Sequence, residues 1–191
     1  MTGTQPPTKP ILTTDTIYHR ADATSPADRT RLTREQQRVL LRPINPSRVA
    51  QDDAGFSHLQ AWDVRAHLIR VFGFGTWSAD LLTIDFMYEQ ETTTRAGKPA
   101  WKVGYRAVVR LTLHDTGATY TEAAAGEAIL PDFKRGDAHD MAIKTAESQA
   151  LKRCATNLGT QFGLSLYDNG NVHDVVRGVL GLNLDADEVP S

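Results

Sequence analysis

The spacing of apolar side chains first follows the period of a helix. Thr33 and Gln36 stand three residues apart in a capping-box arrangement, and the short helix that they begin must end before Pro43. Ser57 and Gln60 repeat this arrangement and predict the start of a second helix. The second helix carries an apolar stripe whose members recur every three or four positions: Leu59, Trp62, Ala66 and Ile69.

From about residue 77 the apolar spacing changes to two, the period of a β-strand. Leu82, Ile84 and Phe86 alternate with polar residues in a first strand, and the segment ETTTRAGK supplies a hairpin connection. The turn HDTGA leads to a third strand, TYTEAAAGEA, whose alanines and glycine give it a weaker pattern. The strand between them has seven apolar side chains on one face: Trp101, Val103, Tyr105, Ala107, Val109, Leu111 and Leu113.

A last helix follows the strands. Asp137 can cap its first turn, and the helix continues to Gly159. The predicted order of elements indicates an α+β fold, in which a three-stranded antiparallel β-meander with packed helices forms a β-β-β-α core. We expect this domain over residues 31–170, a flexible leader over residues 1–30, and an acidic, partly disordered tail over residues 171–191.

The charge of the chain gives no general support for a polyanionic ligand. The formal net charge is -2, from 21 basic and 23 acidic side chains. Residues 31–170 hold 17 of the basic and 16 of the acidic side chains. A surface that binds phosphates must therefore be a local group of cations. The only cysteine, Cys154, excludes an intrachain disulfide and is expected to be buried. Without an apolar run of about 18 residues or a secretory signal, we expect a cytoplasmic protein with no membrane contact.

One candidate surface lies on the polar face of the second strand. Lys102, Arg106 and Arg110 recur there at every fourth position, about 13 Å apart. A solvated outer face is the simpler explanation. The glutamates that usually balance such a face are missing from the strand, however, and this favours a basic surface.

A second candidate lies in the last helix. Lys152 and Arg153 are adjacent there, and Lys144 lies about 80° away from Lys152 around the helix axis. Adjacent basic residues are common on helices, and this pair could equally stabilise the negative end of the helix dipole.

No pattern in the sequence supports catalysis. The segment FGFGTW lacks the spacing of a glycine-rich phosphate loop, and the histidines show no paired spacing typical of a metal site. A serine nucleophile elbow and an acidic nuclease cluster are also missing. We therefore expect no enzymatic activity, cofactor or metal. Because the aromatic residues fit core positions, we expect contacts to a nucleic-acid backbone rather than base stacking.

Four segments, taken in order, resemble the DNA-binding domain of the Rad52 family of annealing proteins. They are PINPSR (43–48), RVFGFGTW (70–77), VGYRAVVRLTLHDTGATYTE (103–122) and ALKRCATNLG (150–159). Together they extend over about 120 of the 191 residues. The chain corresponds only to the annealing domain of that family.

The resemblance implies two DNA sites. In the first, Arg48, Lys152 and Arg153 line an inner groove that holds the DNA backbone, and we add Lys144 to this set. The chain departs from the family pattern at Thr156, where a further basic residue is expected, and at His58, where an aromatic residue is expected. An outer site has as its nearest candidates a set of basic residues near the first hairpin and before the last helix: Arg95, Lys98, Lys134 and Arg135.

The resemblance further implies a function. We expect a ring-forming homo-oligomer that binds single-stranded DNA and anneals complementary strands in homologous recombination and DNA repair, together with a recombinase or a single-strand binding protein. A bacterial or phage source is expected, with the protein in the nucleoid or in a phage-infected cell. Two alternatives remain open: an oligomeric structural or adaptor protein of the same fold that lacks annealing activity, and a nuclease subunit.

Overall fold

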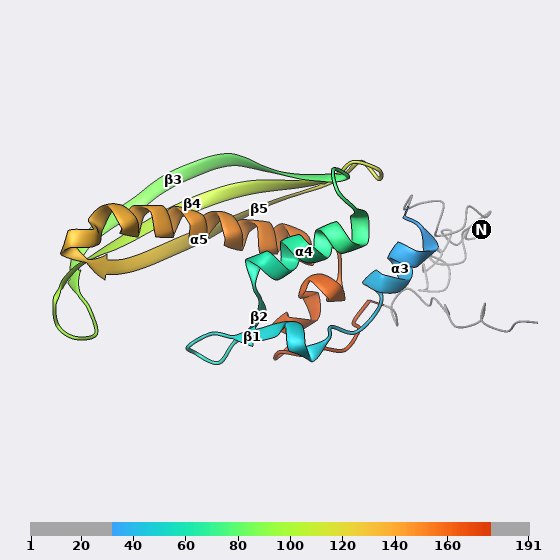
Figure 1. Ribbon diagram of the computed structural model, residues 1–191, viewed down its shortest axis with the longest axis horizontal. Helices are drawn as coiled ribbons and strands as arrows, with labels where there is room; N and C mark the ends of the chain where they lie inside the picture. Colours follow the sequence, from blue (N-terminus) through green and yellow to red (C-terminus); the bar gives the residue numbers. More distant parts are fainter. Residues whose placement is uncertain (1–31, 177–191) are drawn as a thin grey trace, which may run out of the picture.

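A long helix lies along a three-stranded antiparallel sheet in the computed structural model, which describes residues 32–176 (Figure 1). The strands pair in the order β3-β4-β5, and the helix α5 packs on β4 and β5. The bounds are Trp77–Thr93 for β3, Pro99–Leu113 for β4, Ala118–Pro131 for β5 and Arg135–Thr156 for α5. The predicted α+β fold with its three-stranded antiparallel meander is therefore confirmed.

Most of the remaining elements gather near the end of the sheet where α5 finishes (Figure 1). β1 and β2 form a small antiparallel pair of their own. The elements are α3 (Arg34–Leu40), the 3-10 helix η1 (Pro46–Arg48), β1 (Val49–Gln51), β2 (Ser57–Leu59), α4 (Ala61–Phe72), η3 (Thr160–Phe162) and η4 (Leu164–Tyr167). A further 3-10 turn, η2 (Asp132–Lys134), precedes α5 at the other end.

The alternating pattern of β4 builds the core, as predicted. Its apolar face is buried at five positions and partly buried at Trp101 and Tyr105. The larger core cluster joins this face to Leu68 of α4, Leu151 of α5 and Phe162 of η3. Cys154 is fully buried in the same cluster, where its thiol donates a hydrogen bond to the carbonyl of Val109.

Small residues allow α5 to lie unusually close to β5. Four alanines at every fourth position of α5 are inaccessible to solvent: Ala138, Ala142, Ala146 and Ala150. Opposite them, a Cβ atom added to Gly126 would lie 2.2 Å from the backbone nitrogen of Ala146 and 2.4 Å from the carbonyl oxygen of Ala142. The alanines and glycine that weaken the strand pattern in the sequence are thus required by the helix that covers the strand.

Of the three predicted helix starts, one is confirmed and two are wrong. Thr33 forms both hydrogen bonds of the capping box with Gln36, and α3 ends before Pro43. Ser57 does not cap α4, because its backbone pairs with Gln51 in the β1–β2 ladder. α5 begins at Arg135 without a side-chain cap, ahead of the predicted start.

The apolar face of α4 is also rotated from the predicted stripe. Its buried apolar residues are Val64, Leu68, Val71 and Phe72. Trp62, a member of the predicted stripe, is 68% exposed. The core contact with η3 lies on the other side of the helix, and tertiary packing decides which of two possible stripes is buried.

The described residues include only a small part of the predicted terminal segments. The leader, residues 1–30, and most of the tail, residues 177–191, lie outside the described residues. The start of the tail packs on the domain, where the amide of Ile44 donates a hydrogen bond to the carbonyl of Val172. None of the helices between residues 32 and 176 has both the length and the apolar character that crossing a membrane requires.

Replacement of Gly126 by valine should destabilise the fold. The new side chain would collide with the backbone of α5, so we expect the free energy of unfolding to fall by roughly 1–3 kcal/mol. Urea denaturation followed by circular dichroism measures this change. Ala125→Val is the matched control, since Ala125 is the exposed neighbour on the other face of β5, and it should change stability by less than about 0.5 kcal/mol. Equal stability of the two variants would contradict the proposed packing constraint.

Candidate nucleic-acid interface

Lys152 and Arg153 line a pocket between the last turns of α5 and the segments that face it. The cavity has a volume of about 190 Å³. The other residues that line it come mainly from β2 and from the η3–η4 segment: Ser57, His58, Leu59, Val64, Gln149, Thr156, Phe162, Gly163, Leu166 and Tyr167. No carboxylate is among the lining residues. This composition gives the pocket a positive charge that its own walls do not balance.

Lys152 is the central cation of this pocket. Its side chain is partly buried, and it forms no ion pair or hydrogen bond with any residue in the described range 32–176. Burial lowers the pKa of Lys152 from its usual value. The fold therefore desolvates an ammonium group for which the described part of the chain supplies no counter-charge, and an anion bound in the pocket would offset that cost.

Arg153 stands beside it and keeps most of its hydrogen-bonding capacity. Its Nη2 lies 3.5 Å from Oε2 of Glu122, and its side chain is 53% exposed. An ion pair of that length at the surface contributes little free energy. The guanidinium can therefore turn toward an incoming phosphate at low cost.

Arg48 lies elsewhere and is fully engaged. Its Nη2 is 2.8 Å from Oδ2 of Asp63, its Nε donates to both carboxylate oxygens, and its Nη1 donates to Oε1 of Gln161. Both side chains of the pair are nearly buried, with 13% and 7% of their surface exposed. The pocket that Arg48 lines also contains Trp62 and Arg70, but neither Lys152 nor Arg153. Arg48 therefore lines a different pocket within the described residues, and its convergence on one trench with Lys152 and Arg153 stays a prediction.

Lys144 belongs to a third hollow. Its Nζ lies 2.6 Å from Oδ2 of Asp140 one turn earlier on α5, and both side chains are largely exposed. Lys134, Asp137 and Met141 line the same hollow. The residues predicted for one inner groove thus line three hollows, of which those of Lys144 and Lys152 are neighbours that share Gln149.

Two of the three basic residues on the polar face of β4 form ion pairs with carboxylates of the neighbouring strands. Lys102 forms an ion pair of 2.9 Å with Glu127 of β5, and Arg106 forms one of 2.8 Å with Asp85 of β3. Arg110 stands opposite Asp80 in the β3–β4 register. The predicted lack of balancing acids is therefore wrong, because they come from neighbouring strands and not from β4 itself.

Among the residues predicted for the outer site, Arg135 is held by contacts with the sheet, whereas Arg95, Lys98 and Lys134 lie on exposed segments. Arg135 makes a two-pronged contact with Glu89 and lies 4.1 Å from the ring centroid of Trp101, so it fastens α5 to the sheet. These hydrogen bonds hold the pKa of Glu89 at about 2. Arg95 faces Asp53 at 3.5 Å with both side chains almost fully exposed. Lys98 at the same hairpin and Lys134 in η2 are exposed.

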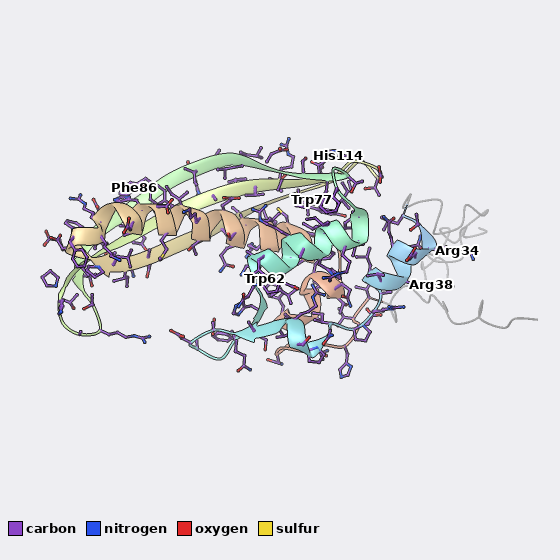
Figure 2. All side chains as sticks on the ribbon, viewed as in Figure 1. Arg34, Arg38, Trp62, Trp77, Phe86 and His114 are labelled. Atoms are coloured by element: carbon purple, nitrogen blue, oxygen red, sulfur yellow. The ribbon has the colours of Figure 1, made fainter. Side chains whose placement is uncertain are left out.

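Two exposed aromatic residues line the pockets of Arg48 and Lys152, and the sequence analysis predicted neither position. Trp62 projects from the start of α4, as Figure 2 shows, and lines the pocket of Arg48. Tyr167 is 72% exposed and lines the pocket of Lys152. A helical pattern drawn through Val64, Leu68 and Val71 would have placed Trp62 on the outer face. No sequence signal marks Tyr167, because it lies in an irregular segment.

His67 of α4 is buried, and its ring packs edge-on against Phe162 of η3. Its Nδ1 lies 2.9 Å from Nη1 of Arg70, and its Nε2 has no hydrogen-bond partner among residues 32–176. Burial, followed by the charges of Arg48 and Arg70, lowers the pKa of His67 to about 4. This histidine therefore stays neutral in the folded protein at physiological pH.

The comparisons with known proteins agree on one family. Residues 31–177 match the model of the Rad52/22 family double-strand break repair protein. The DNA repair and recombination protein RAD52 of Eremothecium gossypii is 32% identical over 123 residues, which are 63% of this chain and 26% of the relative. RAD52 of Saccharomyces cerevisiae is 31% identical over 123 residues, 63% of this chain and 24% of the relative.

A third relative shows a longer match. The DNA repair and recombination protein rad22 of Schizosaccharomyces pombe is 29% identical over 147 residues, which are 73% of this chain and 29% of the relative. The chain thus spans about a quarter of the length of the curated relatives that it matches. The similarity extends over the sheet, α5 and the pocket of Lys152.

The neutral state of His67 predicts that stability depends on pH. The pKa is about 4 in the folded protein and near 6.5 in the unfolded chain, so the folded state binds fewer protons between these values. The free energy of unfolding should therefore fall as the pH drops from 6.5 toward 4, by up to about 1.4 kcal/mol per pH unit. Urea denaturation at pH 7, 6 and 5 measures this slope.

His67→Asn tests the assignment of that slope. Asparagine can place a polar atom near the position of Nδ1 and does not titrate, so the decline between pH 6.5 and 5 should become smaller. His114→Asn, at an exposed position, should keep the slope of the unmodified protein. Parallel slopes in both variants and the unmodified protein would exclude His67 as the source.

Proposed function

Because the chain belongs to the Rad52/22 family of double-strand break repair proteins, we propose that it binds single-stranded DNA through its phosphates and anneals complementary strands in homologous recombination and repair, without chemical catalysis. The observation that carries this proposal is Lys152, a partly buried cation in a pocket without a carboxylate. The relatives named above are themselves DNA repair and recombination proteins.

A phosphate fits the chemistry of this pocket. A phosphate would supply a negative counter-charge for the ammonium group of Lys152, and the guanidinium of Arg153 can donate further hydrogen bonds to it. Contacts of this kind depend on charge and carry no sequence information. A strand held by its phosphates keeps its base edges free to pair, which annealing requires.

The other basic residues have smaller roles in this proposal. Arg48 could reach a phosphate only by giving up Asp63, so it contributes less than Lys152. Lys144, Lys102, Arg106 and Arg135 are engaged by carboxylates within the protomer. The exposed residues Arg95, Lys98, Lys134 and Arg110 remain candidates for an outer site on the DNA path.

A single protomer offers few free cations, so we place the function in a ring. Repeated copies of the Lys152 pocket would add weak contacts into useful avidity. Both edges of the sheet, β3 and β5, are open in the protomer. Exposed apolar side chains lie on both: Leu81, Leu82, Phe86 and Met87 on β3, and Ile129 on β5 with Met141 on α5. Two different edges that contact each other head to tail form a closed ring when the rotation between copies permits.

Several finer expectations belong to the proposal. The protein would act in the cytoplasm or nucleoid and meet a recombinase or a single-strand binding protein. A bacterial or phage source has no support from the relatives named above, which are fungal. The rival function, an oligomeric adaptor that does not bind DNA, leaves the unpaired charge of Lys152 without an explanation.

Replacement of Lys152 by methionine should weaken DNA binding without unfolding the protein. Methionine keeps the apolar stem and removes the charge. We expect lower affinity for all single-stranded sequences alike, and a plot of log affinity against log salt whose slope is smaller by about 1. Fluorescence anisotropy with labelled oligonucleotides of several sequences measures both effects, and annealing of complementary strands should slow in parallel.

Lys144→Met is the matched control on the same helix. Its ammonium is already paired with Asp140, so the loss of affinity should be much smaller than for Lys152→Met. Unchanged binding in both Lys152→Met and Arg153→Ala would remove the pocket from the proposal.

Charged substitutions on the edge strand should dissociate the ring. Leu82 and Met87 lie at the two irregularities of β3, and their side chains are 40% and 50% exposed. In the double variant Leu82→Glu with Met87→Glu, two carboxylates would have to be buried between copies. Size-exclusion chromatography with light scattering should show a large fall in mass. Phe74→Glu, at an exposed turn outside the edge, should keep the mass of the unmodified protein, and an unchanged mass in the double variant would argue against this edge.

A further inference from the structure

Tyr167 presents an aromatic ring to solvent at the pocket of Lys152. The residue is 72% exposed, and its hydroxyl forms no hydrogen bond within residues 32–176. An aromatic side chain that is this exposed presents a large apolar surface to solvent. Its position beside Lys152 and Arg153 places an aromatic face where a DNA strand would pass.

The segment that carries this ring, η4 with the turn after it, packs closely against β2. Gly163 has a φ of +96°, and a Cβ atom there would lie 3.5 Å from Leu59 of β2. A Cβ atom on Gly170 would lie 2.8 Å from Oγ of Ser57. The backbone after η4 closes on itself through hydrogen bonds from Asp168 to Ser165 and from Gly170 to Leu166. These contacts place η4 and the turn after it beside β2, which lines the same pocket.

We infer that Tyr167 stacks on one base of the strand whose phosphate is bound at Lys152 and Arg153. The inference rests on the proposed function, because it needs single-stranded DNA in this pocket. One sugar joins a phosphate to its base, so a phosphate at Lys152 brings a base to the rim of the same pocket. Every base has a π-face, and a tyrosine ring pays little conformational entropy when it binds one.

The size of the pocket decides how the base is held. Pockets that enclose a small molecule measure about 300–1,000 Å³, whereas this cavity measures about 190 Å³. A base would therefore lie on the rim against Tyr167 and would not be enclosed. Stacking there uses the face of the base and leaves its pairing edge free, so the contact tolerates any sequence and permits annealing.

Abasic DNA separates this contact from binding to the backbone. The affinity of Tyr167→Ala should fall by roughly 5-fold to 100-fold for an ordinary oligonucleotide, the range found when a stacking aromatic residue is removed. For an oligonucleotide of the same length built from abasic residues, the variant and the unmodified protein should bind with equal affinity. Tyr167→Phe should retain most of the affinity for ordinary DNA, and the salt slope of Tyr167→Ala should not change.

The controls distinguish a failure of the inference from a failure of the proposed function. Phe74→Ala removes an aromatic residue that is 87% exposed and does not line the pocket, and it should bind like the unmodified protein. An equal loss on ordinary and abasic DNA, or no loss on either, overturns the stacking inference. If Lys152→Met weakens binding in the same experiment, the phosphate site still stands. If the unmodified protein shows no salt-dependent binding to single-stranded DNA, the proposed function itself falls.

Discussion

The close contact between the backbones of α5 and β5 determines where the basic residues of the helix lie. Gly126 and the buried alanines of α5 leave no room for the helix to shift or rotate on the sheet. With that orientation fixed, the first turn of α5 meets Glu89 and Trp101 through Arg135, and the last turns meet β2 and η3. Lys144 and Lys152 therefore face different hollows although they share one helix.

Whether a basic side chain has a carboxylate partner distinguishes the cations that stabilise the fold from those that can bind a ligand. Lys102, Arg106 and Arg135 are matched by carboxylates across neighbouring elements, and each pair also ties two segments together. Lys152 departs from this pattern, since burial makes its charge costly and no carboxylate within residues 32–176 pairs with it. A ligand that carries negative charge is the simplest physical reason for such an arrangement.

A second anchor holds the small elements that form the opposite wall of the pocket. Arg48 joins η1 to Asp63 of α4 and to Gln161 of η3, and Gln161 donates onward to the carbonyls of Arg42 and Pro43. Removal of one partner from a buried pair of this kind would leave an uncompensated charge. The arginine that family resemblance assigns to DNA thus has a visible structural role, because its contacts join η1, α4 and η3.

The sequence alone determined the features that depend on neighbouring residues. The α+β order of elements, the Thr33 capping box and the buried face of β4 follow from local hydrogen bonds and from a period of two, and the structure confirms them. It also singled out Lys152 and Arg153. Tertiary structure alone decided which charges form ion pairs, that Ser57 enters a strand and that Trp62 faces solvent. It also decided that Arg48 pairs with Asp63 and is not among the residues that line the pocket of Lys152 and Tyr167. These outcomes depend on partners distant in the sequence, because an ion pair or a buried face is set by what packs across from it.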